Sequence, residues 1–258
     1  MELKNKNVVI TGSSRGIGWA LAHALAKNGA QLHLVQRSWD KAKILELEKL
    51  SGSEIKQWTC DLSQLVQVKE LCANLKSQPI DILINNAGIL TGELLENQTD
   101  EEIENVFQMN LTVSALLTKA VLPKMLKQKS GLIVNNTSVS AYMRFPCATT
   151  YAAAKSGLLA MTECLDTELT GTGVSTLALV TPGIKTDMFD AIKTSYGKYF
   201  EAPDDYISAD EYADQVIEAI KKNEKYLLPS GQTRLGLWIA QYAPSLFKKV
   251  VVGRFVRK

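Results

Sequence analysis

Tyr151 and Lys155 lie four residues apart in Tyr-Ala-Ala-Ala-Lys, and their types and spacing are the first sign of chemistry in this chain. The apolar spacing predicts a helix over residues 150 to 165, with an apolar face through Leu158, Leu159, Met161, Leu165 and Leu169. Positions i and i+4 share one face of a helix, so the lysine ammonium would favour the phenolate of the tyrosine. A phenol has a pKa of about 10, and this tuning would let it exchange a proton nearer neutral pH.

Ser138 lies thirteen residues before this tyrosine, at the end of the apolar run Leu-Ile-Val-Asn-Asn-Thr-Ser. The run predicts a buried strand, so the hydroxyl would project at the C-terminal edge of a sheet, where α/β proteins bind ligands. Reduction of a carbonyl by a nicotinamide requires a proton donor beside the developing alkoxide, and these groups would meet that need. The Tyr-x-x-x-Lys spacing alone also occurs on many purely structural helices, so the interpretation depends on the surrounding elements.

A glycine-rich turn near the N-terminus supplies that context. The apolar run Val8-Val9-Ile10 leads into Thr-Gly-Ser-Ser-Arg-Gly-Ile-Gly over residues 11 to 18, and a helical pattern then continues to Lys27. A strand, a glycine turn and a helix in this order cradle a pyrophosphate, because the glycines allow close backbone approach and the helix N-terminus attracts anions. The turn therefore predicts a dinucleotide site.

The chain resembles the short-chain dehydrogenase/reductase family over roughly residues 5 to 190. The resemblance rests on motifs in the family's order and spacing: the glycine turn, Asn85-Asn86-Ala87-Gly88, Asn110 in Met-Asn-Leu, Ser138, Tyr151 to Lys155, and Pro182-Gly183 followed by Thr186. It implies that Tyr151 donates the proton and that Ser138 orients and polarises the carbonyl. Lys155 would hold the nicotinamide ribose and lower the tyrosine pKa, and Asn110 would hold a water that relays protons to solvent.

The resemblance also implies a set of cofactor-binding residues along the chain. These are Gly12, Ser14, Arg15, Gly16, Ile17, Gly18, Arg37, Asp61, Leu62, Asn86, Ala87, Gly88, Tyr151, Lys155, Pro182, Gly183, Ile184 and Thr186. Asp61 is expected to contact the adenine, to cap the helix that follows it, or to do both. Asn86 and Ala87 are expected to contact the adenosine ribose, while the asparagines of this motif could equally tie the central strands together.

Charge at the end of the second predicted strand favours NADP(H) over NAD(H). An NAD enzyme usually carries an acid there for the ribose 2′-hydroxyl, whereas this chain has Gln36 followed by Arg37. Arg15 and Arg37 could together hold the 2′-phosphate, which a carboxylate would repel. The alternative is that both arginines are ordinary solvated charges. Asp40 lies past the end of this strand, and its position is typical of an acidic residue at the start of a helix.

Composition and patterning predict one α/β domain with a doubly wound parallel sheet. The 258 residues are 46% hydrophobic with a formal net charge of +2, which gives no indication of nucleic-acid binding. Strand patterns near residues 7–11, 31–36, 55–59, 80–85, 131–138, 174–180 and 226–228 alternate with helical ones, and the family implies the order 3-2-1-4-5-6-7. Four cysteines without a C-x-x-C pair and two histidines predict neither a metal site nor a disulfide framework.

The substrate is expected to be a hydrophobic carbonyl or alcohol. In the family, a segment corresponding to about residues 184 to 212 forms a lid, and here it contains Phe189, Tyr196, Tyr199 and Phe200. Tyr142, Met143 and Phe145 indicate the same preference, or else they pack the lid onto the body. The run Pro-Gly-Ile-Lys-Thr-Asp-Met resembles that of 3-oxoacyl-carrier-protein reductases, but the chain continues about thirty residues beyond Leu228, unlike those enzymes. A 3-oxoacyl-thioester reductase, and a dinucleotide-binding adaptor or sensor without turnover, remain alternatives.

Residues 233 to 258 are expected to form a basic amphipathic extension of a domain that spans residues 1 to 232. From Lys225 onward there are seven basic residues and no acidic one. Two short helices broken at Pro244 are predicted, either packed on the body or on a partner subunit, or resting on an anionic membrane with Trp238, Phe247 and Phe255 at the interface. The expected location is the cytoplasm, with peripheral membrane contact if the second alternative holds.

A homodimer or homotetramer is expected as well. The predicted helices around residues 101–127 and 152–170 carry apolar residues on more than one face, including Leu116, Leu117, Val121, Leu122, Leu159 and Met161. One contact with the sheet would not cover them all. Members of the family pair through these helices.

Overall fold

Seven parallel strands form the central sheet of the computed structural model, which describes residues 1–188, 190, 197, 199 and 206–257. The spatial order is β3-β2-β1-β4-β5-β6-β9, which confirms the predicted doubly wound arrangement with β9 as the seventh strand. The strands are β1 (Asn7–Thr11), β2 (Gln31–Gln36), β3 (Lys56–Thr59), β4 (Ile82–Asn85), β5 (Gly131–Asn136), β6 (Val174–Leu179) and β9 (Tyr226–Leu227). The strand order reverses between β1 and β4, and at such a point this type of fold has the crevice in which it binds ligands.

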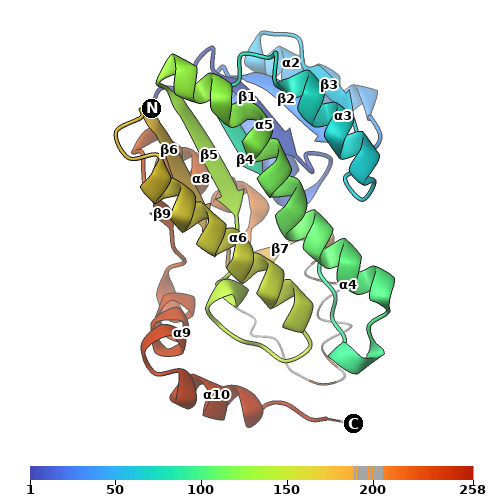
Figure 1. Ribbon diagram of the computed structural model, residues 1–258, viewed down its shortest axis with the longest axis vertical. Coiled ribbons are helices and arrows are strands. Elements are labelled where there is room, and N and C mark those ends of the chain that lie inside the picture. Colours follow the sequence, from blue (N-terminus) through green and yellow to red (C-terminus); the bar gives the residue numbers. More distant parts are fainter. Residues whose placement is uncertain (189, 191–196, 198, 200–205, 258) are drawn as a thin grey trace.

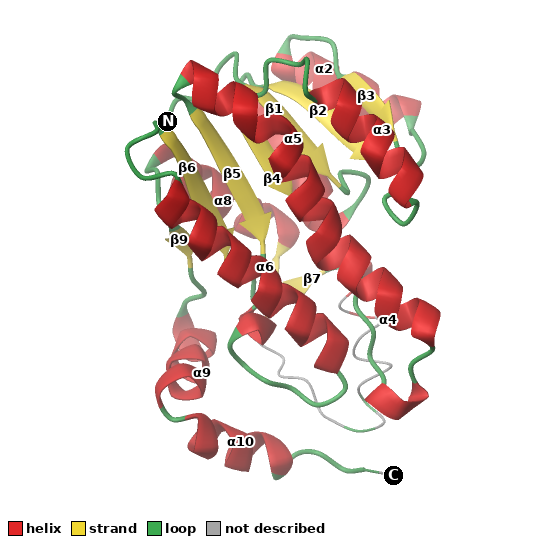
Figure 2. Ribbon diagram, viewed as in Figure 1, coloured by secondary structure: helices red, strands yellow, loops and turns green. Residues whose placement is uncertain are grey.

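The central strands are apolar along their whole length because helices cover both faces of the sheet. One face is packed by α1 (Gly16–Lys27), α2 (Lys41–Ser51) and α8 (Ala209–Lys221). The other is packed by α3 (Leu65–Leu75), α5 (Val113–Gln128) and α6 (Thr149–Glu168), and α4 (Asp100–Phe107) continues the line of α5 (Figure 2). Val8 and Ile10 of β1 pack against the first group of helices, and Val9 packs against the second.

Local sequence signals set where several helices begin. Asp40 caps α2 by accepting hydrogen bonds from the backbone N–H groups of Ala42 and Lys43, as its position predicts. Thr99 and Glu102 form a reciprocal capping box at the start of α4. Short 3₁₀ turns occupy Leu95–Asn97 and Val139–Ala141, and a π turn occupies Gln108–Thr112 between α4 and α5. A small second sheet pairs β7 (Gly183–Lys185) with β8 (Tyr206–Ser208).

The C-terminal extension forms two helices below the carboxyl edge of the sheet (Figure 1). They are α9 (Gly231–Tyr242) and α10 (Pro244–Val252), and the chain turns between them at Pro244, as predicted. Leu237 and Ala240 of α9 are buried against Met143 and Val180. The extension therefore packs on the body of its own chain.

His33 of β2 is buried without a hydrogen-bond partner for either ring nitrogen among the described residues. Its ring is stacked on that of Trp58, with 6.2 Å between the ring centroids. Burial, together with the nearby charge of Lys56, lowers the pKa of His33 from 6.5 to about 4. The folded protein therefore holds this imidazole in its neutral form at physiological pH.

This histidine predicts a loss of stability in mild acid. Between pH 6.5 and 4 His33 is protonated in the unfolded chain but neutral in the folded chain. The free energy of unfolding therefore falls as the pH falls. The contribution amounts to about 2 kcal/mol between pH 8 and pH 5. Urea denaturation at both pH values should show a smaller loss for His33→Leu than for the wild type. His23→Gln, which removes the other histidine, is the control and should keep the full loss, and an unchanged pH dependence in His33→Leu would refute the assignment.

Candidate active site

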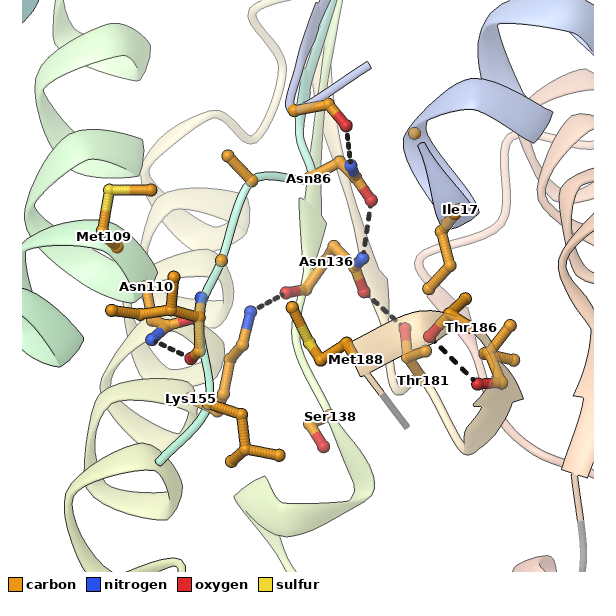
Figure 3. A pocket seen from close by; sticks show the side chains of 18 of the residues that line it. Ile17, Asn86, Met109, Asn110, Asn136, Ser138, Lys155, Thr181, Thr186 and Met188 are labelled. Carbon is orange, nitrogen blue, oxygen red and sulfur yellow. Dashed lines mark hydrogen bonds between the residues drawn. The ribbon is translucent and has the colours of Figure 1, made fainter. Parts of the chain in front are cut away.

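A cavity of about 780 Å³ opens at the carboxyl ends of β1, β4, β5 and β6. Its wall is formed by the glycine turn after β1, the loops after the other three strands, and one face of α6. Every residue that the sequence predicts for catalysis or cofactor binding lines this cavity, including residues as distant in sequence as Gly12 and Thr186. Figure 3 shows part of this wall.

Tyr151 and Lys155 lie on the same face of α6, with Lys155 Nζ 5.8 Å from the centroid of the tyrosine ring. The Lys155 side chain is 4% exposed, and its ammonium donates a hydrogen bond of 2.6 Å to the backbone oxygen of Asn136. Burial lowers the pKa of Lys155 to about 8. Burial raises the pKa of Tyr151, and a hydrogen bond with Ser138 opposes this rise. The predicted lowering of the tyrosine pKa by the lysine thus stays a prediction.

Ser138 begins the 3₁₀ turn that follows β5, and its Oγ accepts a hydrogen bond of 3.1 Å from the backbone N–H of Ser140. A serine hydroxyl can accept in this way and still donate its own proton. The turn thus holds the oxygen in place beside the phenol of Tyr151, at the edge of the sheet where the sequence predicts it.

Asn110 is fully buried in the π turn between α4 and α5. Its amide nitrogen donates to the backbone oxygens of Ile89 and Val106, and its Oδ1 accepts from the Ile89 N–H at 3.2 Å. A Cβ at Gly88 would lie 2.5 Å from that Oδ1, so only glycine fits there. The side chain of Asn110 therefore ties the loop after β4 to this widened turn, a feature common at functional sites.

The glycine turn has the geometry of a phosphate cradle. Gly16 has a φ of +54°, in the left-handed region that favours glycine, and a Cβ there would lie 3.2 Å from Thr186. A Cβ at Gly18 would lie 2.1 Å from the backbone oxygen of Gly12, which explains the third glycine. The first turn of α1 has no acidic residue and no side-chain cap, which leaves its N–H groups available to a phosphate. These residues fit a dinucleotide.

Three polar side chains form a continuous string across the ends of the strands (Figure 3). The amide of Asn86 donates to the backbone oxygen of Thr11 at 3.0 Å and accepts from the amide of Asn136 at 2.9 Å. Thr181 then donates to Asn136 and shares its hydroxyl with the phenol of buried Tyr212, 2.7 Å away. The sequence analysis missed Asn136 and Thr181, although for Asn136 a polar residue at the end of a buried strand was a signal.

The two arginines predicted for the cofactor both line the cavity. Arg15 pairs with Asp187 at 3.6 Å, and both side chains are largely exposed. Arg37 is close enough to Asp61 to help lower the pKa of that carboxyl, although the hydrogen bond from the Ser63 backbone N–H is the larger cause. Asp61 does not cap the following helix, since the N-cap of α3 is Gln64.

Apolar side chains also line the cavity. Met143, Phe145 and Met188 are among them, whereas Tyr142 packs against Ala141 and Leu159. The expected lid residues Phe189, Tyr196 and Phe200 lie outside the described residues. Tyr199 contacts the small cluster around Cys147.

Comparison with known proteins identifies the family. Residues 6–197 match the family model for short chain dehydrogenases. The chain belongs to this family. A short chain dehydrogenase of Pseudocercospora fijiensis is 35% identical over 75% of this chain and 65% of its own length. A 3-oxoacyl-[acyl-carrier-protein] reductase of Rickettsia conorii is 34% identical over 74% of this chain and 78% of its own.

A solved structure extends the similarity of this short chain dehydrogenase to nearly its whole length. The short-chain dehydrogenase from Sphingobium yanoikuyae, solved in complex with NADPH, has a TM-score of 0.81 and 25% identity. The match covers 98% of this chain and 96% of that one, so it includes most of the C-terminal extension. The fold of the extension is therefore shared with another member of the family.

The polar string predicts a measurable contribution of Asn136 to stability. Asn136→Leu keeps the backbone oxygen that holds Lys155, but it leaves Asn86 Oδ1 without its donor and removes one of the hydrogen-bond partners of Thr181, which keeps Leu179 and Tyr212. The free energy of unfolding should fall by about 1 to 3 kcal/mol, the cost of unpaired buried polar groups. Urea denaturation measures this change. Asn74→Leu on exposed α3 is the control and should change it by less than about 0.5 kcal/mol; equal effects of the two variants would contradict the role of the string.

Proposed function

We propose that this short chain dehydrogenase is an NADP(H)-dependent oxidoreductase that transfers a hydride between nicotinamide and a carbonyl or secondary alcohol of a hydrophobic small molecule. The observation that carries the proposal is that Ser138, Tyr151 and Lys155 line one cavity together with the glycine turn. A bound nicotinamide would supply or accept the hydride.

The proton is handled by residues of the chain. Tyr151 donates its phenolic proton to the carbonyl oxygen as the hydride reaches the carbon, and it takes the proton back in the oxidative direction. Ser138 donates a hydrogen bond to the same oxygen and stabilises the charge that develops on it. Lys155, whose pKa of about 8 lies near physiological pH, can stabilise the phenolate and restore its proton. Asn110 fixes the π turn between α4 and α5. A water held at this turn would relay protons between Lys155 and solvent.

NADP(H) is preferred over NAD(H) because two arginines line the cavity and β2 ends in a neutral residue. The arginines are Arg15 and Arg37, and the residue that ends β2 is Gln36, which accepts a hydrogen bond from Ser13. A 2′-phosphate gains from two guanidinium groups and meets no carboxylate on β2. The NADPH complex of the Sphingobium relative agrees with this preference.

A hydrophobic substrate is supported by the side chains around the catalytic groups, Met143, Phe145 and Met188. The Rickettsia relative favours one alternative, a 3-oxoacyl thioester as substrate. A binding or sensing protein without turnover is the other. A panel of ketones, aldehydes and acyl thioesters, followed by the absorbance of NADPH, separates the three: turnover of free ketones supports the proposal, turnover of acyl thioesters alone supports the first alternative, and no turnover supports the second.

The first prediction of this proposal concerns the proton donor. Tyr151→Phe removes the acidic proton and should lower kcat by at least about a hundredfold, with NADPH affinity within about threefold of wild type. Steady-state kinetics and fluorescence titration measure the two quantities. Tyr226→Phe, which removes a phenol hydroxyl from the surface, is the control and should leave kcat unchanged. Wild-type activity in Tyr151→Phe would exclude the assignment.

The second prediction concerns the cofactor. The wild-type protein should bind NADPH more tightly than NADH, and Arg37→Asp should reverse the order, because a carboxylate repels the 2′-phosphate and accepts from the 2′-hydroxyl. Fluorescence titration with both nucleotides checks this. Lys41→Asp makes the same change of charge nearby, outside the cavity lining, and should keep the preference for NADPH. Equal affinities in the wild-type protein would refute the prediction.

The third prediction concerns assembly. We propose a homodimer or homotetramer through α4, α5 and α6, where Leu116, Leu122 and Met161 are only partly buried within one chain. Association would remove this apolar surface from water. Light scattering at micromolar concentration should give a mass at least twice that of the 28.4 kDa chain. A monomeric mass would be the contrary result.

A further inference from the structure

The outward side of α9 carries a stripe of large apolar residues. Leu235, Trp238 and Tyr242 are 60%, 57% and 67% exposed. Their spacing of three and four residues places them on one face of the helix, opposite the buried side chains of Leu237 and Ala240. The rings of Trp238 and Tyr242 lie against each other, with their centroids 5.6 Å apart. The body of the protein leaves this stripe uncovered.

The outward side of α10 continues this surface and adds positive charge. Leu246 and Val250 are 54% and 53% exposed, and Lys248 and Lys249 are exposed beside them. Val251 is buried, and Phe247 packs edge-on against Phe145 with 5.8 Å between the ring centroids. The outward face of the tail is defined by seven exposed side chains of α9 and α10: Leu235, Trp238, Tyr242, Leu246, Lys248, Lys249 and Val250.

The charge around this face is of one sign. From Lys225 to the C-terminus the chain has seven basic residues and no acidic one. Arg257 pairs with Glu96, and Lys225 pairs with Asp166. By contrast, Arg234, Lys248, Lys249 and Arg254 make no ion pair within the described part of the chain. The exposed apolar stripe thus lies among cations that the fold does not neutralise.

We propose that the outward face of the tail binds an anionic lipid surface. Aromatic and aliphatic side chains mixed with lysine and arginine on two short helices are typical of segments that lie in the headgroup region, with the cations on lipid phosphates. The contact lies flat on the surface, since no described helix is long and apolar enough to cross a membrane. Of the aromatic residues expected at the interface, only Trp238 takes part, because Phe247 and Phe255 pack against the body.

Charge also decides between a membrane and a second copy of the chain. In a symmetric dimer through this face, the cations of α10 would meet the same cations of the partner. Like charges brought together in a partly buried contact are unfavourable, whereas an anionic headgroup layer is complementary to them. The lipid surface is therefore the occupant that the charges favour.

The position of the face connects it to the cavity. Thr233 of α9 lines the cavity, and a Cβ at Gly236 would lie 3.0 Å from the terminal methyl of Met143, another lining residue. Both helices lie at the end of the molecule that holds the carboxyl ends of the strands (Figure 1). A membrane bound through α9 and α10 would therefore lie near the cavity, which suits an apolar substrate that partitions into lipid.

Vesicle flotation tests the proposal with the full-length protein. At about 50 mM salt the protein should float with phosphatidylcholine vesicles that contain about one third phosphatidylglycerol, and stay behind with pure phosphatidylcholine. Binding should fall steeply at about 500 mM salt, because screening weakens surface electrostatics. No flotation with anionic vesicles at low salt, or equal flotation with neutral ones, would overturn the proposal.

Two surface variants locate the contact without uncovering the core. Leu235→Ser combined with Trp238→Ser should weaken the binding of anionic vesicles by at least about tenfold. Lys248→Glu combined with Lys249→Glu should do the same through charge. The matched controls are Leu45→Ser with Val66→Ser, and Lys69→Glu with Lys127→Glu, which change exposed residues elsewhere and should bind like wild type. Thermal melting checks that each variant is folded.

The remaining outcomes are also decisive. If the tail variants bind vesicles as well as the controls do, the outward face of the tail is not the contact. If the wild type does not float but its mass in sedimentation falls when Leu235 and Trp238 are replaced, a second copy covers the face and the lipid proposal is wrong. Flotation needs no turnover, so it stands or falls separately from the proposed oxidoreductase activity.

Discussion

The hydrogen bond from Lys155 to the backbone oxygen of Asn136 is the interaction on which the site depends. A charged amine that is 4% exposed must be held by a polar partner, since burying it unpaired would be costly. Burial brings its pKa down to about 8, and the carbonyl fixes where its proton lies. Because Lys155 and Tyr151 share a face of α6, the same hydrogen bond also fixes the position of the Tyr151 phenol beside Ser138.

The position of that carbonyl depends in turn on the ends of the strands. Parallel strands end at one edge of the sheet, so loops far apart in sequence emerge side by side. The string from Thr11 through Asn86 and Asn136 to Thr181 joins four of these ends with hydrogen bonds between buried and partly buried groups. Each of these bonds forms between segments that the sheet has already ordered, so little further conformational entropy is lost. The catalytic groups are held by the sheet rather than by the loops alone.

The C-terminal extension shows how one segment serves two environments. Its inner side chains, among them Leu237 and Phe247, belong to the same apolar cluster as Met143 and Phe145, which line the cavity. Its outer side chains remain in contact with water and carry the uncompensated positive charge. A helix with apolar residues on two faces needs contacts on both faces, and the body of the protein covers only one of them. Because α9 also lies beside the cavity, whatever covers its outer face would lie close to the cavity.

The motifs of the sequence by itself identify the family, and the family implies the order of the strands and the predicted site residues, though not Asn136 or Thr181. These motifs are short-range patterns: apolar runs for buried strands, the glycine-rich turn, and the four-residue spacing of Tyr151 and Lys155. Only the tertiary structure decided what depends on distant groups meeting. It buried Lys155 and assigned Asn136 to hold it, left the ring nitrogens of His33 without a hydrogen bond among the described residues, and turned Phe247 and Phe255 inward while Trp238 stayed exposed. Periodicity shows that a helix has faces, but which face is buried is decided by what packs against it.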